Sequence, residues 1–214
     1  MSGQKEIPAV RQRLIVGVTG ATGIVYARRL LELLRALRVE THLVITRAGE
    51  QSAAYELQGH AAALRELASV TYPIKDIGAA IASGSFTTLG MIVAPCSINT
   101  VAQIAAGTTS NLLTRAADVC LKERRRLVLM ARESPLHEGH LRSMLAVTQY
   151  GGIIAPPVPA FYTQPQSLQE MVDHTVGRVL DLFGLDAGVV PRWDGTPRPS
   201  LAPDNGSCPE ARSD

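Results

Sequence analysis

The segment LIVGVTGATG, residues 14–23, decides the fold of this chain. Its first half, residues 14–18, is an uninterrupted apolar run, which is typical of a strand buried on both faces of a parallel sheet. Glycines at 17, 20 and 23 then allow a tight turn in which the backbone can approach a ligand. Their spacing differs from the Gly-x-Gly-x-x-Gly of dinucleotide-binding turns, so a turn without a ligand is an alternative interpretation.

Strands and helices alternate from this segment to residue 183. Apolar and β-branched runs predict the strands, and helical periodicity predicts the helices between them. We expect strands at 14–18, 42–45, 70–74, 90–94, 127–130 and 153–155, and helices at 24–37, 50–57, 61–68, 99–106, 112–122, 137–149 and 167–183. This order predicts an α/β protein with a single domain of three layers, in which helices cover both faces of a parallel sheet.

The composition excludes several functional classes. With 214 residues, of which 46% are hydrophobic and 19% charged, the chain can bury one sizeable core. A net charge of +2 and only nine aromatic residues argue against nucleic-acid binding. We find no apolar run of about 18 residues and no apolar signal segment, so we expect a cytoplasmic protein without a membrane span. Three widely spaced cysteines and five histidines without His-x-x-x-His spacing predict no disulfide framework and no metal site.

Polar residues follow the ends of the predicted strands. In an open parallel sheet, ligands bind beyond the carboxyl ends of the strands, so these residues can be considered together. They are Gly20, Ala21 and Thr22 after the first strand, Thr46 after the second, Ser97, Asn99 and Thr100 after the fourth, Arg132 and Glu133 after the fifth, and Phe161 and Tyr162 after the last. Hydroxyls, a guanidinium and helix N-termini together predict a phosphate-containing ligand.

The segment PCSINT, residues 95–100, is the most specific of these strand ends. Ser97 and Thr100 begin a helix one turn apart, where both hydroxyls can reach an anion. Ordinary helix capping accounts for Ser97 but leaves Thr100 unexplained. Cys96 has no evident base nearby, and we interpret it as a small buried residue rather than a nucleophile.

One face of the predicted helix 112–122 is polar. Asn111, Arg115, Asp118 and Lys122 follow one another at helical spacing, whereas the remaining positions are mostly apolar. Asp118 supplies only one carboxylate for two cations, so an anionic ligand or a partner subunit would supply the rest. A solvated ladder of ion pairs explains the same pattern equally well.

Three further charged residues are candidates for the site. Glu133 beside Arg132 is a possible proton carrier, or one half of a simple ion pair. Glu56 lies on the helix after the second strand and can reach the same cleft. Arg178 lies on the polar face of the last helix, which by itself is typical of solvated surface.

Together these motifs resemble the UbiX-type flavin prenyltransferases. The matching segments are VTGATG (18–23), SGSF (83–86), GMIVAPCSINT (90–100), SNLLTRAADVCLKERRRLVLMARESPLH (110–137), FYTQPQSLQEMVDH (161–174) and PRW (191–193). The resemblance implies a flavoprotein domain over residues 13–193, preceded by an extension at 1–12. The proline-rich segment 194–214 is expected to be a disordered tail.

The resemblance implies a flavodoxin-like or Rossmann-like flavoprotein that binds FMN and needs no metal. Members of the family transfer a dimethylallyl group from dimethylallyl monophosphate to N5 and C6 of reduced FMN. The product, prenylated FMN, serves a UbiD-type decarboxylase. Members are similar in forming homo-oligomers, usually dodecamers, with the active site between subunits. Such an assembly would explain the polar face of helix 112–122.

The resemblance also implies roles for individual residues. Its FMN contacts fall on Gly20, Ala21, Thr22, Thr46, Ser97, Ile98, Asn99, Thr100 and Arg132. Its dimethylallyl phosphate contacts fall on Tyr162 and Arg178, with Arg115 and Lys122 lining the same pocket. Its catalytic positions fall on Thr22, Glu56, Lys122, Glu133 and Trp193. Thr22 and Thr46 replace serines that are usual in the family, and the added methyl group restricts the hydroxyl's rotamers.

Three other functions share parts of this pattern. An FMN-dependent cysteine-type decarboxylase has the same fold and a PASANT motif similar to PCSINT, but it needs a histidine facing the flavin, for which His60 is the candidate. A short-chain-type NAD(P) reductase also begins with VTGATG, yet none of the five tyrosines has a lysine four residues later. A non-catalytic flavin-binding decarboxylase subunit would need no second group of phosphate-binding cations.

Overall fold

A sheet of six parallel strands forms the centre of the protein, whose computed structural model describes residues 12–57 and 60–192. The strands are β1 (Arg13–Val18), β2 (Glu40–Ile45), β3 (Val70–Tyr72), β4 (Gly90–Cys96), β5 (Arg126–Ala131) and β6 (Ile153–Ile154). Their order is β3-β2-β1-β4-β5-β6, as in the Rossmann fold. The order reverses between β1 and β4, and ligands bind beyond the carboxyl ends of the strands at such a point.

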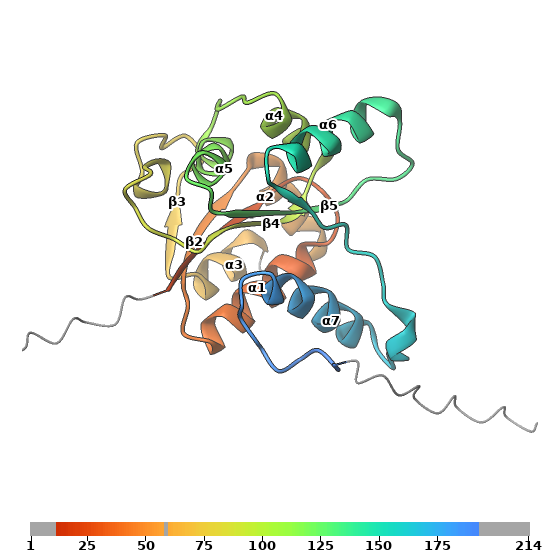
Figure 1. Cartoon of the computed structure of the whole chain (residues 1–214). Helices are drawn as coiled ribbons and strands as arrows, with labels where there is room; N and C mark the ends of the chain where they lie inside the picture. Colours follow the sequence, from red (N-terminus) through yellow and green to blue (C-terminus); the bar gives the residue numbers. More distant parts are fainter. Residues whose placement is uncertain (1–11, 58–59, 193–214) are drawn as a thin grey trace, which may run out of the picture.

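Two layers of helices cover the sheet (Figure 1). One layer holds α1 (Ile24–Ala36), α2 (Arg47–Glu56), α3 (His60–Leu67) and α7 (Leu168–Asp181), and the other holds α4 (Ile98–Ala105), α5 (Leu112–Lys122) and α6 (Glu138–Gln149). Two 3₁₀ turns, η1 (Ala80–Ala82) and η2 (Phe161–Thr163), lie in the connecting loops. The predicted three-layer α/β architecture is confirmed. Within the described segments, no helix is long and apolar enough to cross a membrane.

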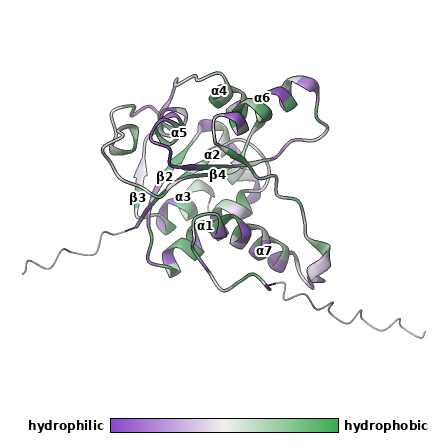
Figure 2. Cartoon of the chain, in the orientation of Figure 1, coloured by the Kyte–Doolittle hydropathy of each residue, from purple (hydrophilic) through white to green (hydrophobic). Residues whose placement is uncertain are grey.

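Alternate residues of β1 face opposite helix layers. Leu14, Val16 and Val18 belong to the core beneath α1 and α7, whereas Ile15 belongs to the core beneath α4 and α5. All four side chains are at most 2% exposed, which explains why the strand is apolar without interruption. Figure 2 shows the hydrophobic strands between helices whose outer residues are mostly hydrophilic.

The predicted elements all occur, with shifts at their ends. Helix α2 begins at Arg47, before the predicted start at 50, because Thr46 caps it and accepts a bond from Gly49 N at 3.0 Å. Strand β4 continues two residues beyond the predicted end at 94, whereas β3 ends two residues before the predicted end at 74. Most of the predicted extension and the whole predicted tail lie outside the described residues.

A buried polar cluster joins β1, β2 and the loop that contains SGSF. His42 is 2% exposed, and its ring nitrogens lie 3.0 Å from Tyr72 Oη and 3.1 Å from Glu40 Oε1. The rings of Phe86 and His42 pack edge to face, with their centroids 5.0 Å apart. The Arg13 guanidinium lies 4.8 Å from the centroid of the Phe86 ring. Burial lowers the pKa of His42, although the hydrogen bond to Glu40 opposes this effect.

We expect His42 to make stability depend on pH. Burial holds the pKa of the folded ring below 6.5, the ordinary value at which the unfolded chain binds a proton. The free energy of unfolding therefore falls as the pH falls through this range, by up to about 1.4 kcal/mol at about pH 5.5. Urea unfolding at about pH 7.5 and about pH 5.5 measures the free energy of unfolding of both proteins. The decrease between the two pH values should be larger in the natural protein than in His42→Gln. An equal loss in both proteins would contradict the prediction.

Candidate functional site

Thr19, which is 1% exposed, connects the ends of β1 and β4 by hydrogen bonds. Its hydroxyl donates to Pro95 O at 2.9 Å and accepts from Ser97 N at 2.7 Å. Its backbone N–H also donates to Pro95 O, at 3.2 Å. Thr19 was not among the predicted site residues, because a threonine in a glycine-rich turn gives no sign of contacts 76 to 78 residues away.

Helix α4 begins at this junction. Ser97 is its N-cap and accepts from Thr100 N at 3.3 Å, so the predicted capping role is confirmed. The hydroxyl of Thr100 lies 3.0 Å from Ser97 Oγ, so Thr100 supports the cap as well. Since Ser97 N and Thr100 N have partners within the protein, the free donors at this helix N-terminus are the N–H groups of Ile98 and Asn99. Such groups bind anions.

The N-terminus of α1 is bound by a carboxylate of the protein itself. Glu56 at the end of α2 accepts from Gly23 N at 3.0 and 3.2 Å and from Ile24 N at 2.8 Å. Gly23 has a φ of 107°, which only glycine adopts readily, and this conformation turns both N–H groups toward Glu56. The predicted approach of Glu56 to the cleft is therefore present, through the backbone of the glycine-rich turn.

The first turn of α2 lies against the same loop. A Cβ atom on Gly20 would come within 2.4 Å of Ala48 Cβ, so only glycine fits there. Thr46, two residues earlier, caps α2 at this end of β2. The structure thus brings together the predicted residues at 20–22, Thr46 and the start of α4.

The end of β5 continues this edge of the sheet. Arg132 N donates to Cys96 O at 3.0 Å, which places the exposed Arg132 side chain next to the end of β4. Glu133 accepts from Ser134 N at 3.1 Å, and no ion pair joins it to Arg132 in the described part of the chain. Cys96 is fully buried, and burial raises the pKa of its thiol far above the ordinary value, so the predicted structural role is supported.

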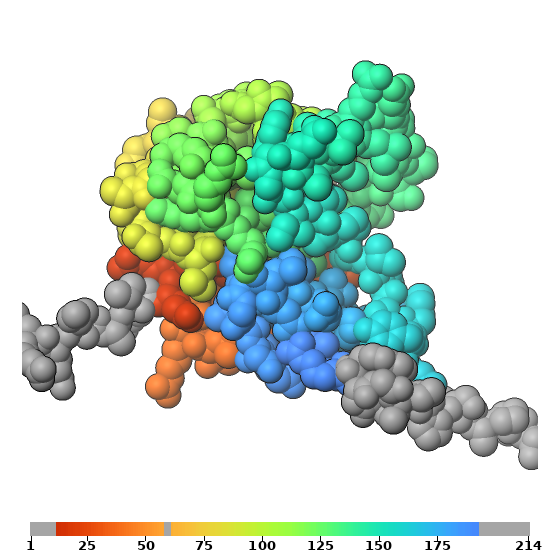
Figure 3. Space-filling view, viewed as in Figure 1, coloured from red at the N-terminus to blue at the C-terminus, as the bar shows by residue number. Residues whose placement is uncertain are grey.

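A second group of polar residues joins the loop after β6 to α7. Tyr162 in η2 places its Oη 3.4 Å from His174 Nε2, with the two rings edge to face at 5.9 Å. Arg178 lies one helical turn beyond His174, and burial together with the Arg178 charge lowers the pKa of this histidine. In Figure 3 the loop before η2 (cyan) lies against α7 (blue). Tyr162 thereby contacts α7 at His174, one helical turn before Arg178; His174 was not among the predicted site residues.

The polar face of α5 is paired within the chain. Arg115 donates to Asp118 at 2.8 Å, and Lys122 pairs with Glu123. The expectation that only one carboxylate is present was wrong, because Glu123 in the turn after α5 supplies the second. The hydrogen bond from Lys122 lowers the pKa of Glu123. Asn111 uses its side chain as the N-cap of α5 and accepts from Thr114 N at 3.1 Å.

Lys122 and Arg132 lie at opposite ends of β5. Lys122 ends the helix that precedes this strand, and Arg132 follows the strand directly. The six residues of β5 span about 20 Å, so the two cations lie too far apart to bind the same phosphate group within a single chain. The structure therefore separates Lys122 from the strand-end residues with which it was predicted to act.

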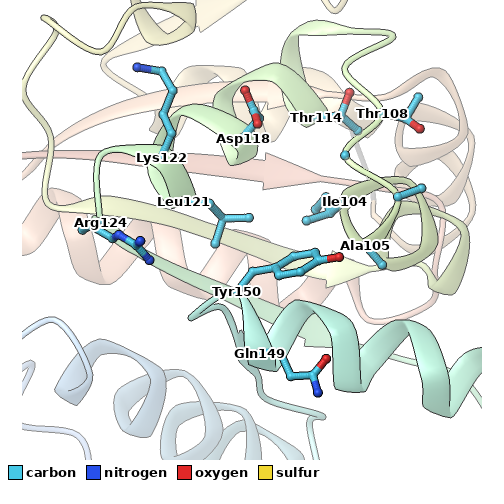
Figure 4. A pocket seen from close by; sticks show the side chains of 12 residues that line it. Ile104, Ala105, Thr108, Thr114, Asp118, Leu121, Lys122, Arg124, Gln149 and Tyr150 are labelled. Carbon is cyan, nitrogen blue, oxygen red and sulfur yellow. The ribbon is translucent and has the colours of Figure 1, made fainter.

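Lys122 instead borders two features at the other end of the sheet. A cavity of about 530 Å³ lies between α4, α5 and α6, and Figure 4 shows Lys122 and Asp118 on one side of α5, away from Leu121 and Tyr150. The SGSF loop lies on the other side, where a Cβ atom on Gly84 would come within 2.8 Å of Lys122 Nζ. Arg125 holds this loop through bonds to the carbonyl oxygens of Gly84 and Phe86.

Two predictions concern residues or ligands that the structure does not describe. Trp193 lies outside the described residues. No group of three or more histidine, cysteine, aspartate or glutamate side chains in the described segments is placed to hold a metal ion.

Known proteins of one family share this sequence over most of its length. A family model described as Flavoprotein matches residues 3–180. A probable UbiX-like flavin prenyltransferase of Bacillus subtilis is 53% identical over 183 residues, which cover 86% of this chain and 90% of that protein. The flavin prenyltransferase UbiX of Escherichia coli K12 is 51% identical over 187 residues, which cover 86% of this chain and 99% of that protein. The chain belongs to the UbiX flavin prenyltransferase family.

Solved structures of UbiX proteins have the same fold. One, in complex with FMN and dimethylallyl pyrophosphate, has a TM-score of 0.85 and 50% identity, and covers 87% of this chain and 99% of that chain. A dodecameric FMN-dependent UbiX-like decarboxylase from Escherichia coli O157:H7 has a TM-score of 0.84 and 46% identity. The match covers 86% of this chain and 100% of that chain. An FMN-dependent cysteine decarboxylase, at 18% identity and a TM-score of 0.56, shares the fold alone.

We expect Thr19→Val to destabilise this UbiX-family protein by about 2 kcal/mol, because it leaves the partly buried Ser97 N–H without its acceptor. Thr19→Ser keeps the hydroxyl and should lose less than half as much. Urea unfolding followed by circular dichroism measures both changes. Equal stabilities of the valine and serine variants would show that the hydroxyl does not hold the strand ends together.

Proposed function

We propose that the protein is a flavin prenyltransferase, which transfers a dimethylallyl group from dimethylallyl monophosphate to N5 and C6 of reduced FMN. The observation that carries this proposal is the presence of two separate sets of residues suited to bind a phosphate, one at the carboxyl edge of the sheet and one on η2 and α7. One is the N-terminus of α4 with Arg132, and the other is Arg178 with Tyr162. A protein that only carried FMN would need the first group alone.

The residues at the crevice suit FMN. The N–H groups of Ile98 and Asn99, one hydroxyl of the hydrogen-bonded pair Ser97 and Thr100, and the Arg132 guanidinium form a set of donors that matches a phosphate dianion. Because Glu56 already binds the N–H groups of Gly23 and Ile24, these two donors of α1 are not available for the same phosphate. The remaining predicted contacts, Gly20, Ala21, Thr22 and Thr46, then lie beside the flavin ring and its ribityl chain.

Each polar residue has a distinct part in the proposed reaction. Reduced FMN supplies the two nucleophilic atoms to which the five-carbon group is attached. Arg178 and Tyr162 stabilise the charge that develops on the departing phosphate, so no metal is required. Thr22 and Glu133 hold and move protons near the flavin. Trp193 is proposed to face the allylic carbon atoms, where an aromatic ring stabilises positive charge.

Glu56 acts mainly through the loop that it holds. Its carboxylate fixes the N–H groups of Gly23 and Ile24, one residue after Thr22. A change at Glu56 would therefore move the Thr22 hydroxyl. This link explains why a residue at the far end of α2 belongs to the site.

We propose that Arg115 and Lys122 complete the site of a neighbouring copy of the chain. Within one chain they lie on α5, and Lys122 is separated from Arg132 by the length of β5. Apolar residues on α6 support such contacts, because Leu141 and Leu145 are 53% and 58% exposed. A dodecamer of the kind formed by the Escherichia coli relative is the proposed assembly. Prenylated FMN would then pass to a UbiD-type decarboxylase.

The defining experiment mixes the purified protein with reduced FMN and dimethylallyl phosphate in the absence of oxygen. We expect mass spectrometry to detect a flavin that has gained one five-carbon prenyl unit. The Escherichia coli UbiX protein serves as the positive control. Absence of the adduct where the control forms it would contradict the function. Loss of carbon dioxide from a cysteine-terminated peptide would instead favour the decarboxylase alternative.

Replacement of Arg178 tests the second phosphate group. We expect Arg178→Ala to raise the KM for dimethylallyl phosphate about 10- to 100-fold, since a charged hydrogen bond is lost, and to leave FMN affinity unchanged. Arg28→Ala is a matched control, because Arg28 is 56% exposed and Arg178 57%, each with one carboxylate partner on its own helix. Loss of FMN binding in Arg178→Ala would contradict the assigned role.

A further inference from the structure

The carboxylate of Asp181, the last residue of α7, binds two guanidinium groups. Arg178 Nη1 donates to Asp181 Oδ2 at 2.7 Å. Arg192 donates to both oxygens, from Nη1 at 2.6 Å and from Nη2 at 2.9 Å, in the paired geometry that arginine and carboxylate favour. Asp186 adds a second carboxylate 3.0 Å from Arg192 Nη2. The Asp181 side chain is 19% exposed, so most of it is covered.

This arrangement is unlike an ordinary ion pair on a helix surface. An exposed pair at this spacing contributes little to stability, and a carboxylate at a helix C-terminus is opposed by the helix dipole. The pair with Arg178 alone therefore contributes little to the stability of α7. The bonds from Arg192 lower the pKa of Asp181, so the carboxylate stays ionised. Its two partners come from α7 and from the segment that follows the domain.

Arg178 keeps most of its donors available. Among the described residues it donates to a carboxylate through Nη1 only, which leaves Nε and Nη2 for a further acceptor. One fixed nitrogen restricts the rotation of a long side chain that is 57% exposed. A guanidinium held in this way loses less conformational entropy when it binds a phosphate.

We propose that Asp181 is a positioning residue that orients Arg178 and connects it, through Arg192, to the segment leading to Trp193. This proposal rests on the proposed function, in which Arg178 binds the phosphate of the prenyl donor. Arg192 directly precedes the chain's only tryptophan. A single carboxylate would thereby orient the phosphate-binding arginine and hold Arg192, the last described residue of the chain.

Asp181→Asn tests the proposal, because asparagine has the same shape without the charge. At saturating reduced FMN we expect the KM for dimethylallyl phosphate to rise about 10-fold, as a charged hydrogen bond is lost, with kcat changing less. FMN affinity should not change. Asp173→Asn is the matched control, since Asp173 also lies on α7 but pairs with Arg29 of α1 and is not bonded to Arg178. It is expected to lower the melting temperature without raising this KM.

Tryptophan fluorescence tests the second half of the proposal. Since Trp193 is the only tryptophan, its emission reports this end of the chain alone. Asp181→Asn and Arg192→Gln should both shift the emission maximum, and Asp173→Asn should not. An unchanged emission in both variants would overturn the connection to Trp193.

The kinetic outcomes separate two failures. If the natural protein forms prenylated FMN and Asp181→Asn keeps its KM, only the positioning role is wrong. If the natural protein forms no adduct, the proposed function fails and the role of Asp181 fails with it. A rise in KM that Asp173→Asn reproduces would show that Asp181 acts through the stability of α7 alone.

Discussion

The junction of β1 and β4 is the constraint on which the candidate site depends. The chain leaves these neighbouring strands toward opposite helix layers, so their last backbone groups have no further strand to pair with. Thr19 satisfies two of them, Pro95 O and Ser97 N, with one buried hydroxyl. The start of α4 is thereby fixed against the glycine-rich turn. Which N–H groups stay free for a ligand follows from this one contact.

The distribution of cations follows from the parallel topology. Each helix before a strand ends at the amino edge of the sheet, and each residue after a strand lies at the carboxyl edge. Lys122 and Arg132 obey this rule and lie at opposite ends of β5. This separation is the reason for proposing that Lys122 acts in the site of a neighbouring chain. The pairing of Lys122 with Glu123 keeps this cation compensated within a single chain.

The sequence was sufficient for the architecture but not for the contacts within the site. Apolar runs and helical periodicity predicted every strand and helix, because burial decides both. The ends of the elements were predicted less well. The start of α2 was missed because the capping role of Thr46 depends on the conformation of the next turn. Thr19 and His174 could not be found, because each acts through a partner that is distant in sequence or lies on a neighbouring element. Motif spacing carries no information on such contacts.

Glu56 determines how an anion can enter the crevice. Two helix N-termini, those of α1 and α4, open there, and both would attract a phosphate. The Glu56 carboxylate satisfies the first N–H groups of α1 and adds a negative charge beside residues 20–22. Under the proposed function, the FMN phosphate is therefore expected at Ile98 and Asn99 of α4, and the flavin ring beside Thr22, where the proposed proton transfer requires it.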